Sequence, residues 1–267
     1  MSELDSIGVV SVATNQYLDY WFDMAKSADL HLFQGHEVVL HVFTDRAKDA
    51  REMAKSLTRV KVDAVQIDAL GWPEATLLRY EIFNSHQEHL REDLLLHLDA
   101  DMLLVEDVGA ELDPKQWNNG IALVRHPGFR RPSFWHRIAL YLRKPRLAIA
   151  DARLKALAGG LGGWESDHQS LAYVPRTLRK SYVCGGTWMG RHYELVSMIG
   201  ELAKRTRTDL DSGVIAVWHD ESHLNWYFSH HATTILGSEY CYAIGYPNIT
   251  DLHARIIAVD KGNERTR

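Results

Sequence analysis

The fold is decided by the stretch Leu94-Leu95-Leu96-His97-Leu98-Asp99-Ala100-Asp101-Met102, an apolar run that ends in two carboxylates one residue apart. The run predicts a buried strand over 94–98. Side chains two positions apart on a strand point to the same side, so we expect Asp99 and Asp101 to aim at one point just past the strand end. Two neighbouring carboxylates repel each other and tend to hold a proton, a conflict that a hard divalent cation removes.

Strands and helices alternate on the amino-terminal side of this stretch. Apolar runs predict strands over 7–12, 38–43 and 60–67, and apolar residues at helical spacing predict helices over 17–33, 46–57 and 74–90. Strands that alternate with helices predict a parallel sheet with helices on both faces, in which ligands bind at the carboxyl ends of the strands. The expected fold therefore places Asp99 and Asp101 at the edge where ligands bind.

The pattern becomes less regular beyond a short strand predicted over 121–125. Residues 130–163 are rich in arginine and aromatic side chains, become rich in glycine towards their end and predict a helix near 146–157. We interpret this segment as an excursion beyond the core sheet of one α/β domain that spans residues 1–267.

The composition excludes several classes of protein. With 46% hydrophobic and 24% charged residues, the 267-residue chain is typical of a soluble globular protein with a sizeable core. A net charge of −5 argues against nucleic-acid binding, which relies on a basic surface. Two cysteines cannot build a disulfide framework, which favours reduced thiols. Because no run is long enough to span a bilayer and no signal-peptide pattern is present, we expect a soluble cytoplasmic protein.

A second cluster of polar side chains is the run Trp218-His219-Asp220-Glu221-Ser222-His223-Leu224-Asn225. Its two histidines are four residues apart, as in a zinc-binding helix, but that pattern needs Glu directly after the first histidine, where Asp220 stands. One interpretation is the start of an amphipathic helix, capped by Asp220 or Ser222, with Trp218 packed inside. The other makes Glu221 a carboxylate that faces a sugar and Trp218 a stacking platform. The local sequence does not decide between them.

Two shorter motifs and the tail have both a structural and a functional interpretation. The segment Cys184-Gly185-Gly186 follows an apolar strand and is typical of a plain turn, although a glycine pair also lets the backbone approach a ligand. His126-Pro127-Gly128-Phe129 is also typical of a turn, with His126 either binding a hydroxyl group or satisfied inside the core. The basic tail over 260–267 is either a solvated end or a segment that folds over a diphosphate.

Taken together and in this order, the motifs resemble those of glycosyltransferase family 6, which contains the histo-blood-group A and B transferases and the α-1,3-galactosyltransferases. The resemblance extends over about residues 7–267. The matching blocks are Val12-Ala13-Thr14 with Tyr17, Val42-Phe43-Thr44-Asp45, Arg79, Asp99-Ala100-Asp101-Met102, His126-Pro127-Gly128-Phe129, Ala172-Tyr173-Val174-Pro175, Gly185-Gly186 and the run from Trp218 to Asn225.

The resemblance implies a GT-A fold and a retaining, metal-dependent hexosyltransferase. Such enzymes move galactose or N-acetylgalactosamine (GalNAc) from a UDP-sugar to the 3-hydroxyl of a β-galactoside glycan, in α linkage. The implied metal is Mn2+, with Mg2+ as the alternative, held by Asp99 and Asp101. It also implies a nucleotide-sugar-binding half over about 1–125 and an acceptor-binding and catalytic half over about 126–267.

Roles for further residues follow from the same resemblance. Those implied for binding the UDP-sugar are Val12, Ala13, Thr14, Tyr17, Arg79, Asp99, Ala100, Asp101, Cys184, Gly185, Gly186, Asp220, Lys261 and Arg267, the last two closing over UDP. Those implied for the acceptor are His126, Trp218 and Glu221. Glu221 matches the family's carboxylate beneath the reacting carbon, either as a covalent nucleophile or as a group that stabilises an oxocarbenium ion.

The resemblance also bears on specificity. Gly186 leaves room for an acetamido group, which favours UDP-GalNAc, whereas Cys184 departs from the family's usual Leu, Met or His. The chain is longer by about one helix between His126 and Pro175, and Ala243 stands where animal enzymes have an acceptor-binding Asp. Three alternatives stay open: a UDP-galactose-specific α-1,3-galactosyltransferase, a non-catalytic galactoside-binding protein on the same fold, and a sugar-1-phosphate nucleotidyltransferase, whose glycine-rich basic loop is missing here.

Overall fold

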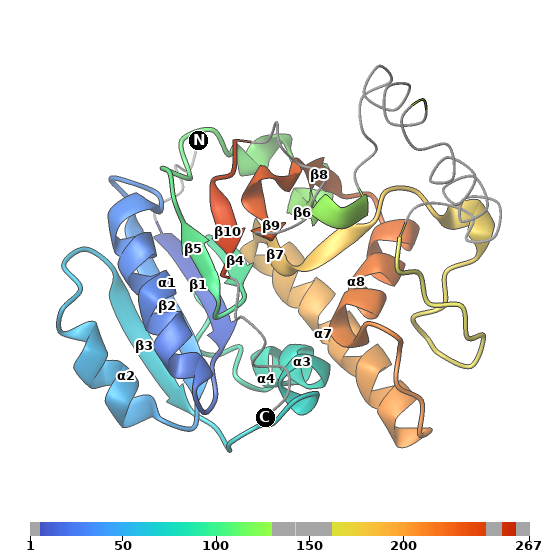
Figure 1. Ribbon diagram of the computed structural model, residues 1–267, viewed down its shortest axis with the longest axis horizontal. Helices are drawn as coiled ribbons and strands as arrows, with labels where there is room; N and C mark the ends of the chain where they lie inside the picture. Colours follow the sequence, from blue (N-terminus) through green and yellow to red (C-terminus); the bar gives the residue numbers. More distant parts are fainter. Residues whose placement is uncertain (1–5, 130–141, 143–161, 244–252, 260–267) are drawn as a thin grey trace.

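A seven-stranded sheet organises the computed structural model, which describes residues 6–129, 142, 162–243 and 253–259 (Figure 1). Its strands, in spatial order, are β3 (Lys61–Gln66), β2 (Glu37–Thr44), β1 (Ser6–Val12), β4 (Leu94–Leu98), β7 (Val183–Arg191), β6 (Ile121–Arg125) and β8 (Thr234–Leu236). Neighbouring strands are parallel except at β7, which runs antiparallel to β4 and β6. The expected mixed α/β fold with a mostly parallel sheet is confirmed.

Helices cover both faces of this sheet. They are α1 (Tyr17–His31), α2 (Ala47–Ala54), α3 (Glu74–Leu77), α4 (Arg79–Ser85), α7 (His192–Asp211) and α8 (His219–His230). On β4, Leu94, Leu96 and Leu98 pack into one core, with residues of α1 and α2, whereas Leu95 packs into the other, with residues of α4, α7 and α8. A strand buried on both faces needs the continuous apolar run that the sequence shows.

Most elements of the amino-terminal half match the sequence-based predictions, with one correction. The helix expected over 74–90 is two short helices, α3 and α4, and the second ends at Ser85. Its break is at Leu78, where the backbone leaves helical geometry (φ −95°, ψ 1°). Arg79 begins α4 and forms ion pairs with Asp99 and Asp220, contacts that fix the direction of the second helix.

A second, three-stranded sheet begins directly after the carboxylate pair. It consists of β5 (Met102–Leu104), β10 (Ile256–Ala258) and β9 (Tyr242–Ala243). To pass from the first sheet to the second, the chain turns at Asp99–Met102, where the Met102 N–H donates to the Asp99 carbonyl (3.1 Å). The expectation that strand alternation orients Asp99 and Asp101 is therefore wrong, because both residues belong to a turn.

The Cys184-Gly185-Gly186 segment, for which a plain turn was favoured, is also corrected. These residues lie inside β7, where Val183 pairs with Arg125 of β6 and the Asp99 N–H donates to the Gly186 carbonyl (3.0 Å). Pairing with strands far away in the sequence keeps the glycine pair extended.

Several predictions lie outside the described residues: most of the 130–163 excursion, its helix near 146–157, and the tail over 260–267. The division into two functional halves stays a prediction. Among the described segments, none of the helices combines the length and apolarity needed to cross a membrane.

Candidate active site

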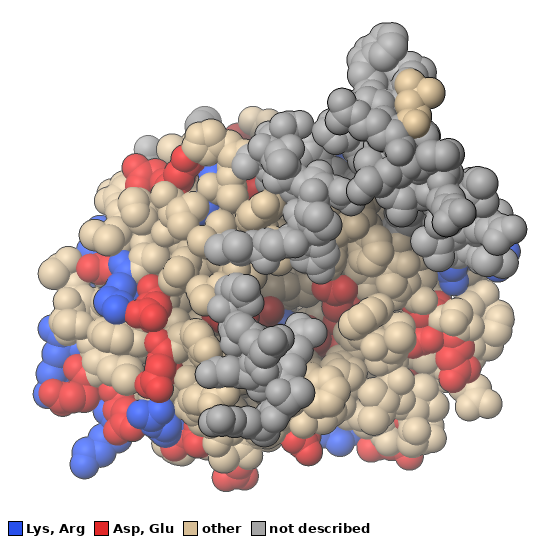
Figure 2. All heavy atoms as spheres, viewed as in Figure 1, with Lys and Arg blue, Asp and Glu red and all other residues tan. Residues whose placement is uncertain are grey.

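Acidic side chains gather in a hollow near the centre of the face shown in Figure 2, between β4, α3 and α8 as labelled in Figure 1. Three elements meet there. The end of β4 brings Asp99, the start of α8 brings Asp220 and Glu221, and β7 brings the backbone of Gly185 and Gly186. The fold thus joins at one edge of the sheet residues that are more than 100 positions apart in the sequence.

Arg79 lies at the centre of this cluster with a buried side chain. Its Nη2 donates to Asp99 Oδ1 (2.6 Å), and its Nη1 donates to Asp220 Oδ2 (2.6 Å) and to the Gly185 carbonyl (3.3 Å). Burial opposes the charge of the guanidinium, but Asp220 and Asp99 outweigh it and raise the pKa of Arg79. A permanent positive charge therefore holds two carboxylates from different elements against β7.

The two carboxylates of α8 have perturbed acidity. Burial raises the pKa of Asp220 to about 6, although Arg79 acts in the opposite direction. Burial also raises the pKa of Glu221 to about 7, partly offset by the Gly185 N–H, which donates to Glu221 Oε2 (2.7 Å), and by the Tyr182 hydroxyl. A buried carboxylate that changes charge near neutral pH is typical of a catalytic group.

The glycine pair of β7 forms the wall that these carboxylates face. A Cβ atom on Gly185 would lie 3.2 Å from Glu221 Cβ, and one on Gly186 would lie 3.0 Å from both Asp99 Oδ2 and Met102 Cε. Cys241 Sγ lies next to the same position, at 3.6 Å from that Cβ. A residue larger than glycine at either position would therefore crowd the side chains of the cluster.

The first turn of α8 bears on both interpretations of this segment. Trp218 is the N-cap residue and has no side-chain capping hydrogen bond, so neither Asp220 nor Ser222 caps the helix. Ser222 Oγ accepts from the Trp218 N–H (3.0 Å), and Asp220 is engaged by Arg79. The proposed inward packing of Trp218 is wrong, since 56% of this residue is exposed. Its exposed indole beside Glu221 is compatible with a stacking platform.

The two histidines of this helix have different partners. The ring of His219 contacts Thr76 Oγ1 through Nδ1 (3.0 Å), and the ring of His223 faces Asp209 through Nε2 (3.5 Å). Burial lowers the pKa of His223 to about 4, which makes it a neutral group of the core. We infer a structural role for this residue.

His126 joins the same region from the end of β6. Its ring packs against Phe129 and Tyr182, with centroids 4.8 Å and 5.8 Å away, and its Nδ1 accepts from the Gly128 N–H (3.0 Å). Burial lowers the pKa of His126 to about 4, so the imidazole is neutral at pH 7. Because Tyr182 also contacts Glu221, the structure brings His126 near the catalytic candidate.

The residues implied for uracil and ribose lie at the carboxyl end of β1, beside the end of β4. Ala13 and Thr14 are buried, and Thr14 Oγ1 donates to the Leu70 carbonyl (2.8 Å). Tyr17 is 37% exposed at the start of α1. Ala100 is buried in the turn between Asp99 and Asp101, whereas Lys261 and Arg267 lie outside the described residues.

Sequence reasoning missed two side chains that the fold places in the site. The ring of His97 stacks on Trp188 (4.6 Å) and contacts Asp99 Oδ1 through Nε2 (3.2 Å), and Tyr182 lies against Glu221. A histidine inside an otherwise apolar strand is a signal that could have found the first. Tyr182 carries no such signal, since aromatic residues before a strand are common in cores.

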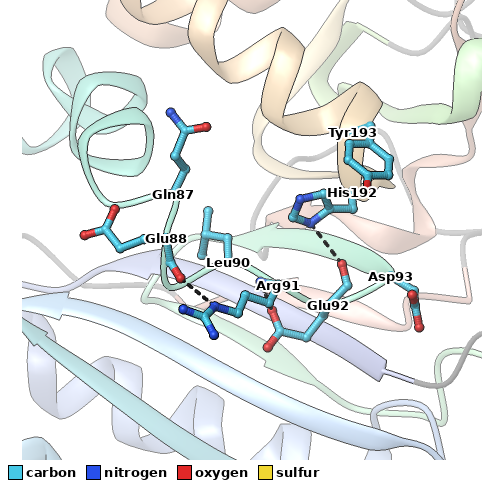
Figure 3. A pocket seen from close by; sticks show the side chains of 8 residues that line it. All are labelled: Gln87, Glu88, Leu90, Arg91, Glu92, Asp93, His192 and Tyr193. Atoms are coloured by element: carbon cyan, nitrogen blue, oxygen red, sulfur yellow. Dashed lines mark hydrogen bonds between the residues drawn. The ribbon is translucent and has the colours of Figure 1, made fainter.

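A separate hollow of about 370 Å³ lies at the opposite end of β4 (Figure 3). Two polar side chains that line it bond to the backbone: Arg91 Nε donates to the Glu88 carbonyl (2.9 Å), and His192 Nδ1 lies 3.2 Å from the Glu92 carbonyl. This end of a parallel strand is away from the edge where ligands bind. We therefore assign no catalytic function to it.

Comparison with known proteins finds a matching protein family. The model of the family described as "Glycosyltransferase family 6" matches residues 2–120 and 162–267. The region between them, 121–161, contains most of the segment that the sequence sets apart from the core.

Individual relatives include animal and bacterial transferases. The histo-blood group ABO system transferase 1 of Rattus norvegicus is 29% identical over 98% of this chain and 68% of its own length. The globoside alpha-1,3-N-acetylgalactosaminyltransferase 1 of Gallus gallus is 27% identical over 98% of this chain and 69% of its own length. The O-antigen biosynthesis glycosyltransferase WbnI of Escherichia coli is 23% identical over 97% of this chain and 96% of its own length.

Proposed function

The chain belongs to glycosyltransferase family 6 and is a hexosyltransferase, and we propose that it transfers GalNAc from UDP-GalNAc to the 3-hydroxyl of a β-galactoside. In this proposal the reaction is metal-dependent and retains the anomeric configuration, giving an α linkage. One observation carries it: Asp99 and Glu221, which belong to two motifs far apart in the sequence, face the same glycine pair on β7. A sugar diphosphate placed there would have its diphosphate near Asp99 and its reacting carbon near Glu221.

Asp99 and Asp101 would hold the divalent metal, Mn2+ or Mg2+. Among the described residues, no three or more His, Cys, Asp or Glu side chains are grouped so that they could hold a metal ion. In this proposal the protein would supply two carboxylates, and the diphosphate would supply further oxygen ligands. Asp99 fits this role because Arg79 and His97 contact its Oδ1 while its Oδ2 faces Gly186. When bound, the ion would supply positive charge that stabilises the departing UDP.

Glu221 would act on the sugar in its ionised form. The Gly185 N–H holds its Oε2 in place, and deprotonation makes it either a nucleophile for a double displacement or a stabiliser of an oxocarbenium ion. Trp218 and His126 would bind the acceptor, the first by stacking on a sugar ring and the second by a hydrogen bond to a hydroxyl group.

Gly186 supports GalNAc as the transferred sugar. A Cβ at this position would lie 3.0 Å from Asp99 Oδ2 and from Met102 Cε. Glycine therefore keeps the wall free of a side chain beside the place proposed for the sugar, where the acetamido group of GalNAc is larger than the hydroxyl group of galactose.

The proposal is tested by release of UDP from UDP-GalNAc and from UDP-galactose, measured with Mn2+ and again with EDTA. We expect Mn2+-dependent release that is faster from UDP-GalNAc, even without an acceptor. An Asp101→Asn variant should need more Mn2+ for half-maximal release, whereas Asp113→Asn, at an exposed turn, should not. Faster release from UDP-galactose would select the alternative donor, and release unaffected by EDTA would contradict the metal site.

A further inference from the structure

Glu165 is a buried carboxylate outside the cluster around Arg79. Only 6% of this residue is exposed, and its two oxygens accept three backbone hydrogen bonds. Oε1 accepts from the N–H groups of Ser166 and Asp167 (both 2.7 Å), and Oε2 accepts from the Val217 N–H (2.7 Å). A buried carboxylate is costly unless donors of this kind satisfy it. Val217 lies 52 positions further along the chain, so the third bond joins this segment to the loop before α8 (Figure 1).

The loop before α8 is held by hydrogen bonds more than by packing. Ile215, Val217 and Trp218 are all more than half exposed, so burial of their side chains does little to fix where they lie. The Val217 N–H is bound by Glu165, and the Trp218 N–H donates to Ser222 Oγ (3.0 Å). The bond from Glu165 therefore fixes the backbone directly before Trp218, the N-cap residue of α8.

The segment that carries Glu165 also meets the side chain of Trp218. A Cβ atom on Gly163 would collide with the Trp218 indole, so glycine lets the backbone lie directly against this ring. The Gly163 carbonyl accepts from the Tyr182 hydroxyl (3.3 Å), and Tyr182 contacts Glu221. One short segment therefore borders both the stacking platform and the tyrosine beside the catalytic candidate.

A second buried carboxylate anchors the same segment to α7. Asp209, which is 3% exposed, accepts from the Ser170 hydroxyl at Oδ2 (2.7 Å) and from the Leu171 N–H at Oδ1 (2.9 Å) and Oδ2 (3.0 Å). Because the segment is fixed to a long helix, the bond from Glu165 ties the loop before α8 to a rigid part of the fold. A binding side chain on a loop needs support of this kind to keep its geometry.

We propose that Glu165 is a positioning residue for the acceptor, which holds the backbone at Val217 and thereby keeps the Trp218 indole where the reacting β-galactoside stacks. The inference rests on the proposed function for the nature of the acceptor, whereas the three hydrogen bonds of the carboxylate do not depend on it. Because Glu165 acts through Trp218, its loss should weaken binding of the acceptor and spare binding of the donor at Arg79 and Asp99.

Glu165→Gln is the informative variant. Its amide has a single acceptor oxygen, which can serve the turn at Ser166 and Asp167 or the Val217 N–H, but not both. We expect KM for lactose as acceptor to rise about tenfold and KM for UDP-GalNAc to stay unchanged. If this variant does not fold, Glu165→Asp replaces it. The shorter side chain withdraws from Val217 but can still bind the N–H two residues on, as Asp167 does with Gln169 (2.9 Å).

Asp167→Asn is the matched control. It removes an equal charge from an exposed residue of the same segment, whose carboxylate bonds within its own turn, and it should change neither KM. A double variant separates positioning from a general loss of stability: with Trp218→Ala already present, Glu165→Gln should not raise KM for lactose further. Additive effects in the double variant, or an equal rise in both KM values, would overturn the proposal.

Failure of the proposed function would be seen separately, by fluorine NMR of the protein labelled with fluorotryptophan and measured without any substrate. The Trp218 signal is identified by its loss in Trp218→Phe. We expect Glu165→Gln to shift or broaden this signal and Asp167→Asn to leave it unchanged. A changed signal would support the positioning role even if no sugar transfer occurred. An unchanged Trp218 signal in Glu165→Gln would refute it even if UDP were released as expected.

Discussion

At the scale of single residues, burial changes what a carboxylate does. Glu221 has an ordinary pKa of 4.5, and its position beneath β7 raises this value to about 7. A nucleophile or an oxocarbenium stabiliser must be ionised, so activity should increase as the pH rises through about 7. A pH profile of UDP release measures this directly, and a profile that is flat from about pH 5 to 9 would show that another group limits the rate.

The raised pKa of Glu221 also predicts that the Glu221→Gln variant is more stable but less active than the original protein. Because the pKa is raised in the folded state, the ionised carboxylate costs stability above about pH 7, and this cost is absent below the ordinary value of 4.5. We expect the variant to have a higher Tm than the original protein at about pH 8, with the difference vanishing near pH 4.5, and to lose about 100-fold or more in transfer. Equal Tm differences at both pH values would contradict the predicted cause.

At the scale of elements, β7 and α8 build the site together. The antiparallel β7 presents the glycine pair to the end of β4, and the first turn of α8 delivers Asp220 and Glu221 to the same backbone. The sequence predicts helical character for α8 and a strand before Cys184. It does not indicate that Cys184, Gly185 and Gly186 continue that strand, because two adjacent glycines favour a turn unless distant strands pair with them.

Gly186→Ala tests the role of β7. The added Cβ would lie 3.0 Å from Asp99 Oδ2 and from Met102 Cε, so kcat/KM should fall about tenfold with UDP-GalNAc and less with UDP-galactose. The control is Gly190→Ala on the same strand, whose Cβ would meet Leu195 Cδ1 at 3.0 Å, away from the site. Both variants should lower Tm, but only the first should change the ratio of kcat/KM for the two donors. An unchanged ratio in Gly186→Ala would remove Gly186 from donor selection.

At the scale of the whole molecule, a buried polar chain ties the sheet together at the edge opposite the site. The ring of His41, 2% exposed on β2, lies between Asp63 Oδ2 (3.2 Å) and Glu92 Oε2 (3.0 Å), which connect it to β3 and to the start of β4. Gly8 on β1 makes this possible, since a Cβ there would lie 2.6 Å from Glu92 Oε2.

The hydrogen bonds between His41, Asp63 and Glu92 predict that the folded protein loses stability in acid. Burial acts to raise the pKa of Glu92, but His41 and nearby backbone groups outweigh it and lower the pKa below its ordinary 4.5. A lowered pKa gives stability that is present above 4.5 and is lost as the pH falls through the folded-state value. Glu92→Gln should therefore lower the free energy of unfolding in urea at about pH 7, with little effect at about pH 3. The exposed neighbour Glu88→Gln should have little effect at either pH, and a pH-independent loss in Glu92→Gln would contradict the mechanism.

The sequence by itself determined where the parallel strands β1 to β4 and the helices α1 and α2 lie along the chain, and that Asp99 follows the end of a buried strand. These features follow from local hydrophobic periodicity, which each segment carries regardless of its partners. The ordered motifs also pointed to the family and to the residues at the site.

Only the tertiary structure decided the break at Leu78, the extended glycine pair and the ion pairs of Arg79. Each depends on groups distant in the sequence: Arg79 meets Asp220 across 141 positions, and the Gly185 N–H meets Glu221 across 36. The acidity of Glu221 likewise follows from burial beneath β7, and burial exists only once the strands and helices have packed.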